Sequence, residues 1–196
     1  MRKFIFSLVM IFTVGCMTLP KPPESVLKVA NDEFRGVKTA TLKMTLMSEE
    51  TTPMMKKNFP MFYVDCVFYK EISEDGKKQV KVNLDISVDV TQKPLTDEAI
   101  FLMGNKKITY RLHNSGIDQM TNVEITKNGY GTDAQVTDVN TMNYQVMKTM
   151  IGLGKEFEEN VSLASPVKMR FYAGTEPMTF VIRTKNLQKL VDFCKI

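Results

Sequence analysis

The sequence has few of the residues that enzymes and metalloproteins use most often. Its 196 residues include a single histidine, His113, and three cysteines. It contains no Gly-x-Ser-x-Gly motif, no glycine-rich phosphate loop and no metal-ligand spacing. His113 is followed by Asn114 and Ser115, but neighbours in sequence seldom supply the geometry of a hydrolytic triad. We therefore assign no catalytic residue, no metal and no cofactor, and expect that the protein is not an enzyme.

A concentrated basic segment is also missing. The pairs Lys56-Lys57, Lys77-Lys78 and Lys106-Lys107 are separated along the chain and lie beside expected turns. Nucleic-acid binding needs basic side chains gathered on one surface, whereas scattered pairs are typical of solvated turns. The composition therefore argues against a nucleic-acid partner.

What the sequence does contain is an export signal at its start. A basic pair precedes an uncharged run, Phe4 to Val14, that is too short to span a membrane. The run ends at Gly15-Cys16, and this junction resembles a lipobox, the motif of bacterial lipoproteins. The resemblance implies cleavage after Gly15 and a diacylated Cys16 that binds a membrane through its lipid. An ordinary cleaved signal peptide and an uncleaved anchor are the alternatives.

The resemblance divides the chain into three segments. Residues 1–15 are the expected signal peptide, and residues 16–24 hold the lipidated cysteine and a stiff tether with three prolines. Loss of Arg2 and Lys3 reduces the 26 basic side chains to 24, against 22 acidic ones. Residues 25–196 are long enough to form one domain with a core of its own. We expect this domain in the bacterial cell envelope, held at a membrane by the N-terminal lipid.

Alternating polarity dominates the domain. The clearest case is Lys78 to Val90, where apolar residues occupy every second position. This period places side chains on one buried and one solvated face of a strand. Met61 to Tyr69 alternates as well, and Asp75-Gly76 between the two segments suits a tight turn. We therefore predict an antiparallel hairpin.

Further strands are predicted from the same pattern and from the turn residues between them. They are residues 37–46, 99–103, 107–112, 122–126, 132–140, 167–173 and 178–182. The predicted fold is a β-rich α+β domain. It consists of a single antiparallel sheet or sandwich of about eight strands, with one or two packed helices that include a C-terminal helix.

Helical spacing of apolar residues is found in two segments. Met147 to Val161 shows it, although Gly152 and Gly154 weaken the start of this segment. A C-terminal helix capped by Thr184 has a clearer apolar stripe. The members of this stripe are Leu187, Leu190, Val191 and Cys194. A third, short helix is expected at 25–33.

Two cysteines besides Cys16 point into the expected core. Cys66 lies on the apolar face of its strand, and Cys194 lies on the stripe of the last helix. In an exported protein the two thiols could form a disulfide, or each could be a separate buried apolar residue. Both alternatives stay open, because the sequence does not reveal the distance between them.

The chain is rich in methionine, with 15 residues, of which 13 remain after loss of residues 1–15. The pairs Met44/Met47 and Met147/Met150 have a spacing of three. Only the second pair would converge, because it lies in the predicted helix rather than in a strand. We interpret the methionines as core residues that fill irregular space rather than as ligands of a soft metal.

Three tyrosines form a candidate partner surface. Tyr63 and Tyr69 share the strand face opposite Phe62 and Phe68, and Tyr172 lies opposite Phe171. Exposed tyrosines can anchor a partner. The alternative is that a helix covers this side of the sheet.

The segment 164–173, followed by a hairpin and a terminal helix, resembles the closing unit of small exported bacterial β-proteins. This resemblance implies an antiparallel sheet closed by a helix and no site residues.

The leading hypothesis is a binding or assembly accessory for an envelope or protein partner. A carrier of an apolar ligand, in a cavity between sheet and helices, is the alternative, and an enzyme with an unrecognised site is the third. An internal cavity favours the carrier, and a filled core with an exposed apolar patch favours the partner. The oligomeric state is not predicted.

Overall fold

The structure, a computed structural model, describes residues 24–50, 62–128 and 135–196. Several predicted features lie outside the described residues. They are the expected signal peptide that ends at Gly15, the lipidation site Cys16, almost all of the tether, and the turn at 129–131. In the described part, no helix is both long enough and apolar enough to cross a membrane.

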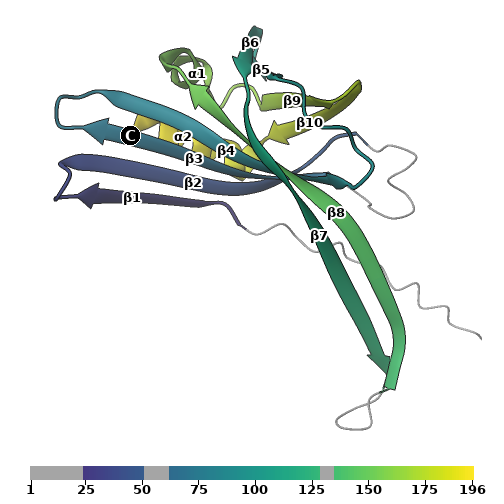
Figure 1. The fold of residues 1–196 in the computed structure, drawn as a ribbon. Coiled ribbons are helices and arrows are strands. Elements are labelled where there is room, and N and C mark those ends of the chain that lie inside the picture. Colours follow the sequence, from purple (N-terminus) through teal and green to yellow (C-terminus); the bar gives the residue numbers. More distant parts are fainter. Residues whose placement is uncertain (1–23, 51–61, 129–134) are drawn as a thin grey trace, which may run out of the picture.

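The described residues form two antiparallel sheets and two helices (Figure 1). The first sheet has six strands in the order β1-β2-β3-β4-β8-β7. Its strands are β1 (Val26–Asp32), β2 (Val37–Met47), β3 (Tyr63–Ser73), β4 (Lys78–Asp89), β7 (His113–Asn128) and β8 (Gln135–Leu153). The second sheet has four strands in the order β10-β9-β5-β6. Its strands are β5 (Glu98–Met103), β6 (Lys106–Arg111), β9 (Val167–Ala173) and β10 (Glu176–Ile182).

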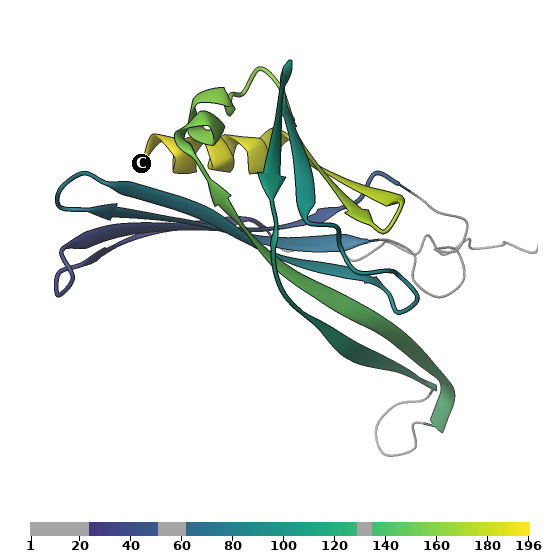
Figure 2. The same cartoon turned by 45° about the horizontal axis from the view of Figure 1, so that its top comes forward.

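The second sheet and both helices, α1 (Lys155–Asn160) and α2 (Thr184–Lys195), lie on one face of the six-stranded sheet (Figure 2). This arrangement confirms the predicted β-rich α+β fold with a C-terminal helix. The predicted hairpin is also present, because β3 pairs with β4 from Tyr63 opposite Ser87 to Ile72 opposite Lys78. Its turn contains Gly76 at φ 79°, a conformation that favours glycine.

Aromatic rings fill the space between the two layers. Phe68 of β3 has its ring centroid 6.1 Å from that of Phe157 and 6.0 Å from that of Phe193. Phe101 of β5 continues the cluster, with its centroid 6.2 Å from that of Phe157. All four rings are fully buried. The core is therefore made by the inward-facing positions of strands from both sheets, together with one ring from each helix.

Two helix predictions were wrong. Residues 147–153 belong to β8, and only Lys155–Asn160 forms a helix. In β8 the buried positions alternate, and they are Gln145, Met147, Thr149, Ile151 and Leu153. Here β8 pairs with β4 on one side and β7 on the other, so backbone hydrogen bonding on both edges outweighs the helical spacing. The short helix expected at 25–33 is instead the edge strand β1.

A buried lysine joins the layers. The Lys70 side chain in β3 is fully buried, and its Nζ donates hydrogen bonds to the carbonyl oxygens of Phe193 (3.3 Å) and Cys194 (3.0 Å). It also forms an ion pair with Glu158 of α1. A cation at the last carbonyls of a helix complements the helix dipole. Lys70 therefore connects β3 to both helices without leaving its charge unpaired.

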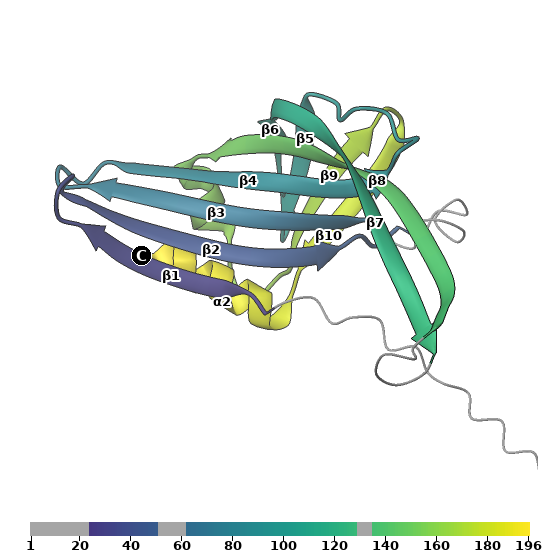
Figure 3. The same cartoon turned by 60° about the horizontal axis from the view of Figure 1, so that its bottom comes forward.

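One hairpin extends beyond the two-layered body. β7 and β8 pair from His113 opposite Met150 to Asn128 opposite Gln135, whereas β4 pairs with β8 only as far as Tyr144. Residues 121–128 and 135–143, which we call the arm, therefore have only each other as strand partners (Figure 3). The weak predictions of strands at 122–126 and 132–140 are confirmed for the described residues, but the actual strands are longer.

Candidate functional site

The outer edge of β7 is the first part of the candidate site. β7 is the last strand of its sheet, so among the described residues no strand pairs with its second edge. From Ile117 to Val123, which we call the β7 edge, the only charged residue is Asp118. Its Oδ2 lies 2.6 Å from Nζ of Lys148 in β8. Edge strands are usually protected by lysine, proline or several charges, and the β7 edge has little such protection.

The Asp118–Lys148 pair crosses the two strands of the hairpin at its base. The hydrogen bond from Lys148 to Asp118 raises the pKa of the lysine, and the attraction of the two charges adds to this. Both side chains are substantially exposed, so the pair contributes little to stability. Its effect on the site is that the single carboxylate of the β7 edge is already neutralised.

Large apolar side chains are exposed along this hairpin. The exposed fractions are 45% for Ile117, 45% for Met120, 51% for Val123 and 54% for Val139. The pairing register places Ile117, Val123 and Val139 on one face of the hairpin and Met120 on the other. Clustered exposed apolar residues mark interaction sites more often than isolated ones do. The hairpin therefore offers contact residues on both faces of an open strand edge.

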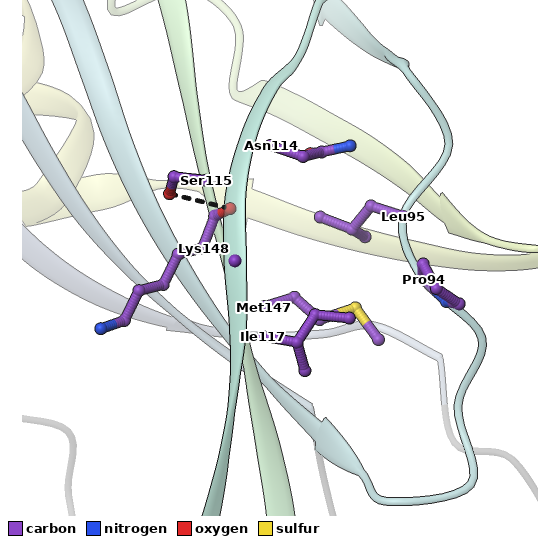
Figure 4. A pocket seen from close by; sticks show the side chains of 8 residues that line it. Pro94, Leu95, Asn114, Ser115, Ile117, Met147 and Lys148 are labelled. Atoms are coloured by element: carbon purple, nitrogen blue, oxygen red, sulfur yellow. Dashed lines mark hydrogen bonds between the residues drawn. The ribbon is translucent and has the colours of Figure 1, made fainter.

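A pocket of about 340 Å³ lies at the base of the hairpin (Figure 4). The connection from β4 to β5 forms one wall with Pro94 and Leu95, and β7 forms the other. Leu95, Ile117 and Met147 supply apolar surface, while the Lys148 ammonium points away from them. Because the lining includes no carboxylate and the lysine is turned away, the pocket suits an apolar side chain better than a charged group.

The shape of this pocket depends on an irregularity in β7. The pairing with β8 shifts between Asn114 and Gly116, so Ser115 is the extra residue of a bulge. Its hydroxyl donates a hydrogen bond of 3.3 Å to the carbonyl oxygen of Lys148. On the body side, Nε2 of the buried Gln145 donates to the carbonyl oxygen of Gln92 at 2.7 Å, which holds the β4–β5 connection to β8. Both walls of the pocket are thus attached to the same strand.

A second pocket of about 280 Å³ lies at the other edge of the same sheet. It is lined by Glu24, Val26 and residues of β2 and β3, among them Lys43 and Asp65. Thr45 donates a hydrogen bond of 2.5 Å to Asp65 in this region. The pocket lies beside Glu24, the first described residue after the tether, and far along the sheet order from β7.

The structure does not bring the three predicted tyrosines together. Tyr63 and Tyr69 lie half-buried on the outer face of the six-stranded sheet, whereas Tyr172 lies on the outer face of β9 in the other sheet. The alternative that a helix covers Tyr63 and Tyr69 is wrong, because both helices pack on the opposite face (Figure 2). Tyr69 already donates a hydrogen bond of 2.9 Å to Glu71, which raises the pKa of the tyrosine.

The two cysteines of the domain are free thiols in the structure. Burial raises the pKa of the Cys66 thiol far above its ordinary range. Burial, followed by the nearby Glu158 carboxylate, raises the pKa of Cys194 to about 12. Both groups are therefore protonated at neutral pH and are poor nucleophiles.

The methionine pair expected to converge does not do so. Met147 and Met150 lie in β8, so their side chains point to opposite faces of the sheet, with Met147 buried and Met150 partly exposed. Among the described residues, no group of three or more histidine, cysteine, aspartate or glutamate side chains could hold a metal ion. His113 is the first residue of β7.

No protein-family model, curated protein or solved structure matches the chain. The hairpin is therefore the candidate site, and four of its exposed apolar residues were not predicted from the sequence as contact residues: Ile117, Met120, Val123 and Val139. The signal in the sequence was weak, because the apolar residues of 117–123 stand at every third position, which is not the period of two that predicts a strand. The pattern does not reveal that one edge of this strand has no partner.

Proposed function

We propose that the protein is a lipid-anchored lipoprotein of a bacterial cell envelope whose domain binds a protein partner through the β7 edge and the arm. The observation that carries the binding role is an almost uncharged, unpaired strand edge flanked by four apolar side chains that are about half exposed. The lipobox-like junction at Gly15-Cys16 supports the anchor.

The mode of binding that this edge suits is strand addition. A partner strand would pair with the free backbone groups of β7, and its alternate side chains would meet the two faces of the hairpin. Ile117 and Val123 would contact it on one face and Met120 on the other. The pocket at the base of the hairpin, next to Ile117, would accept an apolar side chain from the partner.

The tether would hold the domain close to a membrane. Residues 16–24 span at most about 30 Å when fully extended, so an acylated Cys16 would hold the domain within that distance of the bilayer. Binding at the β7 edge would then concern partners that are themselves in or near the membrane. This supports an accessory role in the envelope.

A carrier of an apolar ligand is the second candidate. The pocket of about 340 Å³ favours it, because Leu95, Ile117 and Met147 give that pocket apolar walls. However, the pocket lies at the rim of the six-stranded sheet, and buried aromatic rings occupy the space between sheet and helices. Native mass spectrometry of the purified chain tests the carrier, which predicts a co-purifying small molecule of defined mass.

Intact-mass analysis of the membrane fraction tests the anchor. The expected species begins at Cys16 and carries the added mass of acyl chains. The substitution Cys16→Ala should release the domain from the membrane or leave the chain unprocessed. A mature chain that begins at Cys16 without acyl mass would contradict the lipoprotein proposal.

Crosslinking in intact cells tests the binding role. After detergent extraction, the full chain should be recovered with a reproducible protein neighbour. The matched variant replaces residues 123–141 by Asn-Gly, which closes a two-residue turn between Asn122 and Met142, a directly opposed pair. Because this shortened chain lacks Val123 and Val139 but keeps Ile117 and Met120, the neighbour should be recovered in clearly smaller amounts at equal membrane levels. Its recovery in unchanged amounts would show that the arm is not the binding surface.

A further inference from the structure

The β7 edge has a side-chain pattern that repeats in reverse about its centre. When a strand pairs antiparallel with a copy of itself, each residue lies opposite the one equally distant from the central residue. With Met120 at the centre, Ile117 lies opposite Val123, and Met120 lies opposite its own copy. All three exposed apolar residues of the β7 edge would therefore meet an apolar residue. The remaining pairs are Asp118 with Asn122 and Gln119 with Thr121.

We infer that the partner bound at the β7 edge is a second copy of this chain, paired antiparallel about a two-fold axis at Met120. This inference rests on the proposed binding role and specifies its partner. The resulting interface is isologous, so each copy contributes the same residues and the assembly closes as a dimer. The two six-stranded sheets would join into one continuous sheet.

Charge favours this register over its neighbours. Like charges directly opposite each other destabilise a strand pair, and a centre at Asp118 would place two carboxylates in that position. A centre at Gln119 would place Met120 opposite Asp118, and a centre at Thr121 would place it opposite Asn122. With Met120 at the centre, the carboxylate of Asp118 meets an amide and keeps its ion pair with Lys148.

The register also aligns apolar groups across the four central strands of the dimer. Met120 is directly opposite Tyr144 of β8 in the same chain. The self-paired edge would therefore produce a row in the order Tyr144, Met120, the partner's Met120 and the partner's Tyr144. Thioether and aromatic groups attract each other. On the opposite face, the partner's Val123 would cover Ile117 beside the basal pocket.

The anchor would assist this pairing. Two chains held by lipid on one membrane are confined to a thin layer at its surface. This confinement raises the effective concentration of each chain around the other. A modest edge-to-edge contact can then be populated at expression levels that would leave free domains as monomers.

Disulfide trapping at the two-fold axis tests the inference on the full chain in membranes. Directly opposed residues have Cα atoms about 4.5 to 5.5 Å apart, a separation that a disulfide spans. Met120→Cys should therefore give, after mild oxidation, a species of twice the chain mass in most molecules. Val123→Cys is the matched control. In this register Val123 lies opposite Ile117 of the other copy, so the two Val123 positions are six residues, or about 20 Å, apart along the strands. Val123→Cys should therefore give no more dimer than the unmodified chain.

The register can be confirmed with a mixed pair. Chains with Ile117→Cys and chains with Val123→Cys should crosslink to each other when expressed together, although neither crosslinks to itself. Met120→Lys places like charges opposite each other and should abolish the dimer in detergent sedimentation. The control Val139→Lys, which changes a similarly exposed apolar residue on β8, should retain the dimer.

The outcomes separate this inference from the proposed function. Absence of the Met120→Cys dimer, or equal self-crosslinking of Val123→Cys, overturns the self-pairing. If Met120→Cys is instead trapped with a different protein, the binding role of the β7 edge stands and the second copy is refuted. If it is trapped with nothing, and the shortened arm loses no neighbour in cells, both proposals fail.

Discussion

The two-layered body and the projecting hairpin are both built from antiparallel strands, but their apolar side chains have opposite environments. In β4 the apolar positions are shielded by the second layer, and Val82, Leu84 and Ile86 are fully buried. In the β7 edge the apolar residues stand at every third position, and Ile117 and Val123 remain about half exposed. Exposed apolar area contributes nothing to folding until something covers it. Burial of apolar side chains therefore stabilises the body, whereas the hairpin leaves part of its apolar surface exposed.

Polar groups show the same contrast. In the body, the buried Lys70 is paired with two carbonyl oxygens and with Glu158. At the base of the arm, the only carboxylate of the β7 edge is paired with Lys148 in solvent, where screening weakens the attraction. A two-stranded ribbon alone is marginally stable in water. The arm therefore depends on the body for its position, and its exposed apolar residues are those that the proposed partner would bury.

The largest expected difference concerns core truncation. Phe68→Ala should lower the free energy of unfolding by about 3 to 5 kcal/mol, because Phe68 is fully buried against Phe157 and Phe193. Val123→Ala, in the arm, should change it by less than about 0.5 kcal/mol. Urea unfolding of both variants measures the difference. Similar losses would show that the arm is part of the cooperative core.

The next effect concerns the buried ion pair. Glu158→Gln leaves the Lys70 charge buried without its carboxylate and should cost about 3 kcal/mol. The matched control is Glu159→Gln on the same helix, which removes only an exposed pair with Lys155 and should cost less than about 0.5 kcal/mol. Thermal unfolding of the two variants tests this. Equal shifts in Tm would contradict a role for Lys70 in joining the layers.

A third effect depends on pH and belongs to the body. The pKa of the fully buried Cys66 thiol is raised above its ordinary value of 9.0. Above pH 9 the unfolded chain therefore binds fewer protons than the folded chain, and stability present below pH 9 is lost as the pH rises. The slope should approach about 1.4 kcal/mol per pH unit for this thiol. Urea midpoints between pH 8 and 11 measure it, and Cys66→Ala should reduce the slope. A flat profile would contradict the burial of Cys66.

The smallest effect on stability is expected from shortening the arm. Replacing residues 123–141 by Asn-Gly keeps Met142 and Tyr144, which pack against the core. The free energy of unfolding measured in urea should therefore remain within about 0.5 kcal/mol of that of the full chain, while partner binding is weakened. A large loss of stability would remove the distinction between scaffold and contact surface.

The elements that could be predicted from the sequence are those whose two faces differ sharply. The β3–β4 hairpin has a strict alternation and an Asp75-Gly76 turn, and the C-terminal helix has an apolar stripe, so local pattern and tertiary burial agree. The region of Met147 to Leu153 misled the prediction because its inward positions include the polar Thr149. Thr149 interrupts the period of two, while Met150, Leu153, Phe157 and Val161 have helical spacings of three and four.

The candidate site could not be predicted, because pairing is a property of the whole sheet. The apolar residues of 117–123 have a spacing of three, which does not predict a strand, and the free edge follows from the position of β7 at the end of the sheet order. In the same way, Lys70 looks like any strand lysine in the sequence. Its burial results from the C-terminal end of α2 and from α1 lying over β3.

Site-specific photocrosslinking in membranes tests the central claim most directly. A photoreactive residue is placed at Gln119, on the β7 edge, or at Lys168, on the outer face of β9, in the otherwise unchanged full chain. Both positions are exposed in the structure. We predict a discrete adduct from position 119, of twice the chain mass, and none from position 168. Equal adducts at both positions, or an adduct only at position 168, would contradict the assignment of the hairpin as the contact surface.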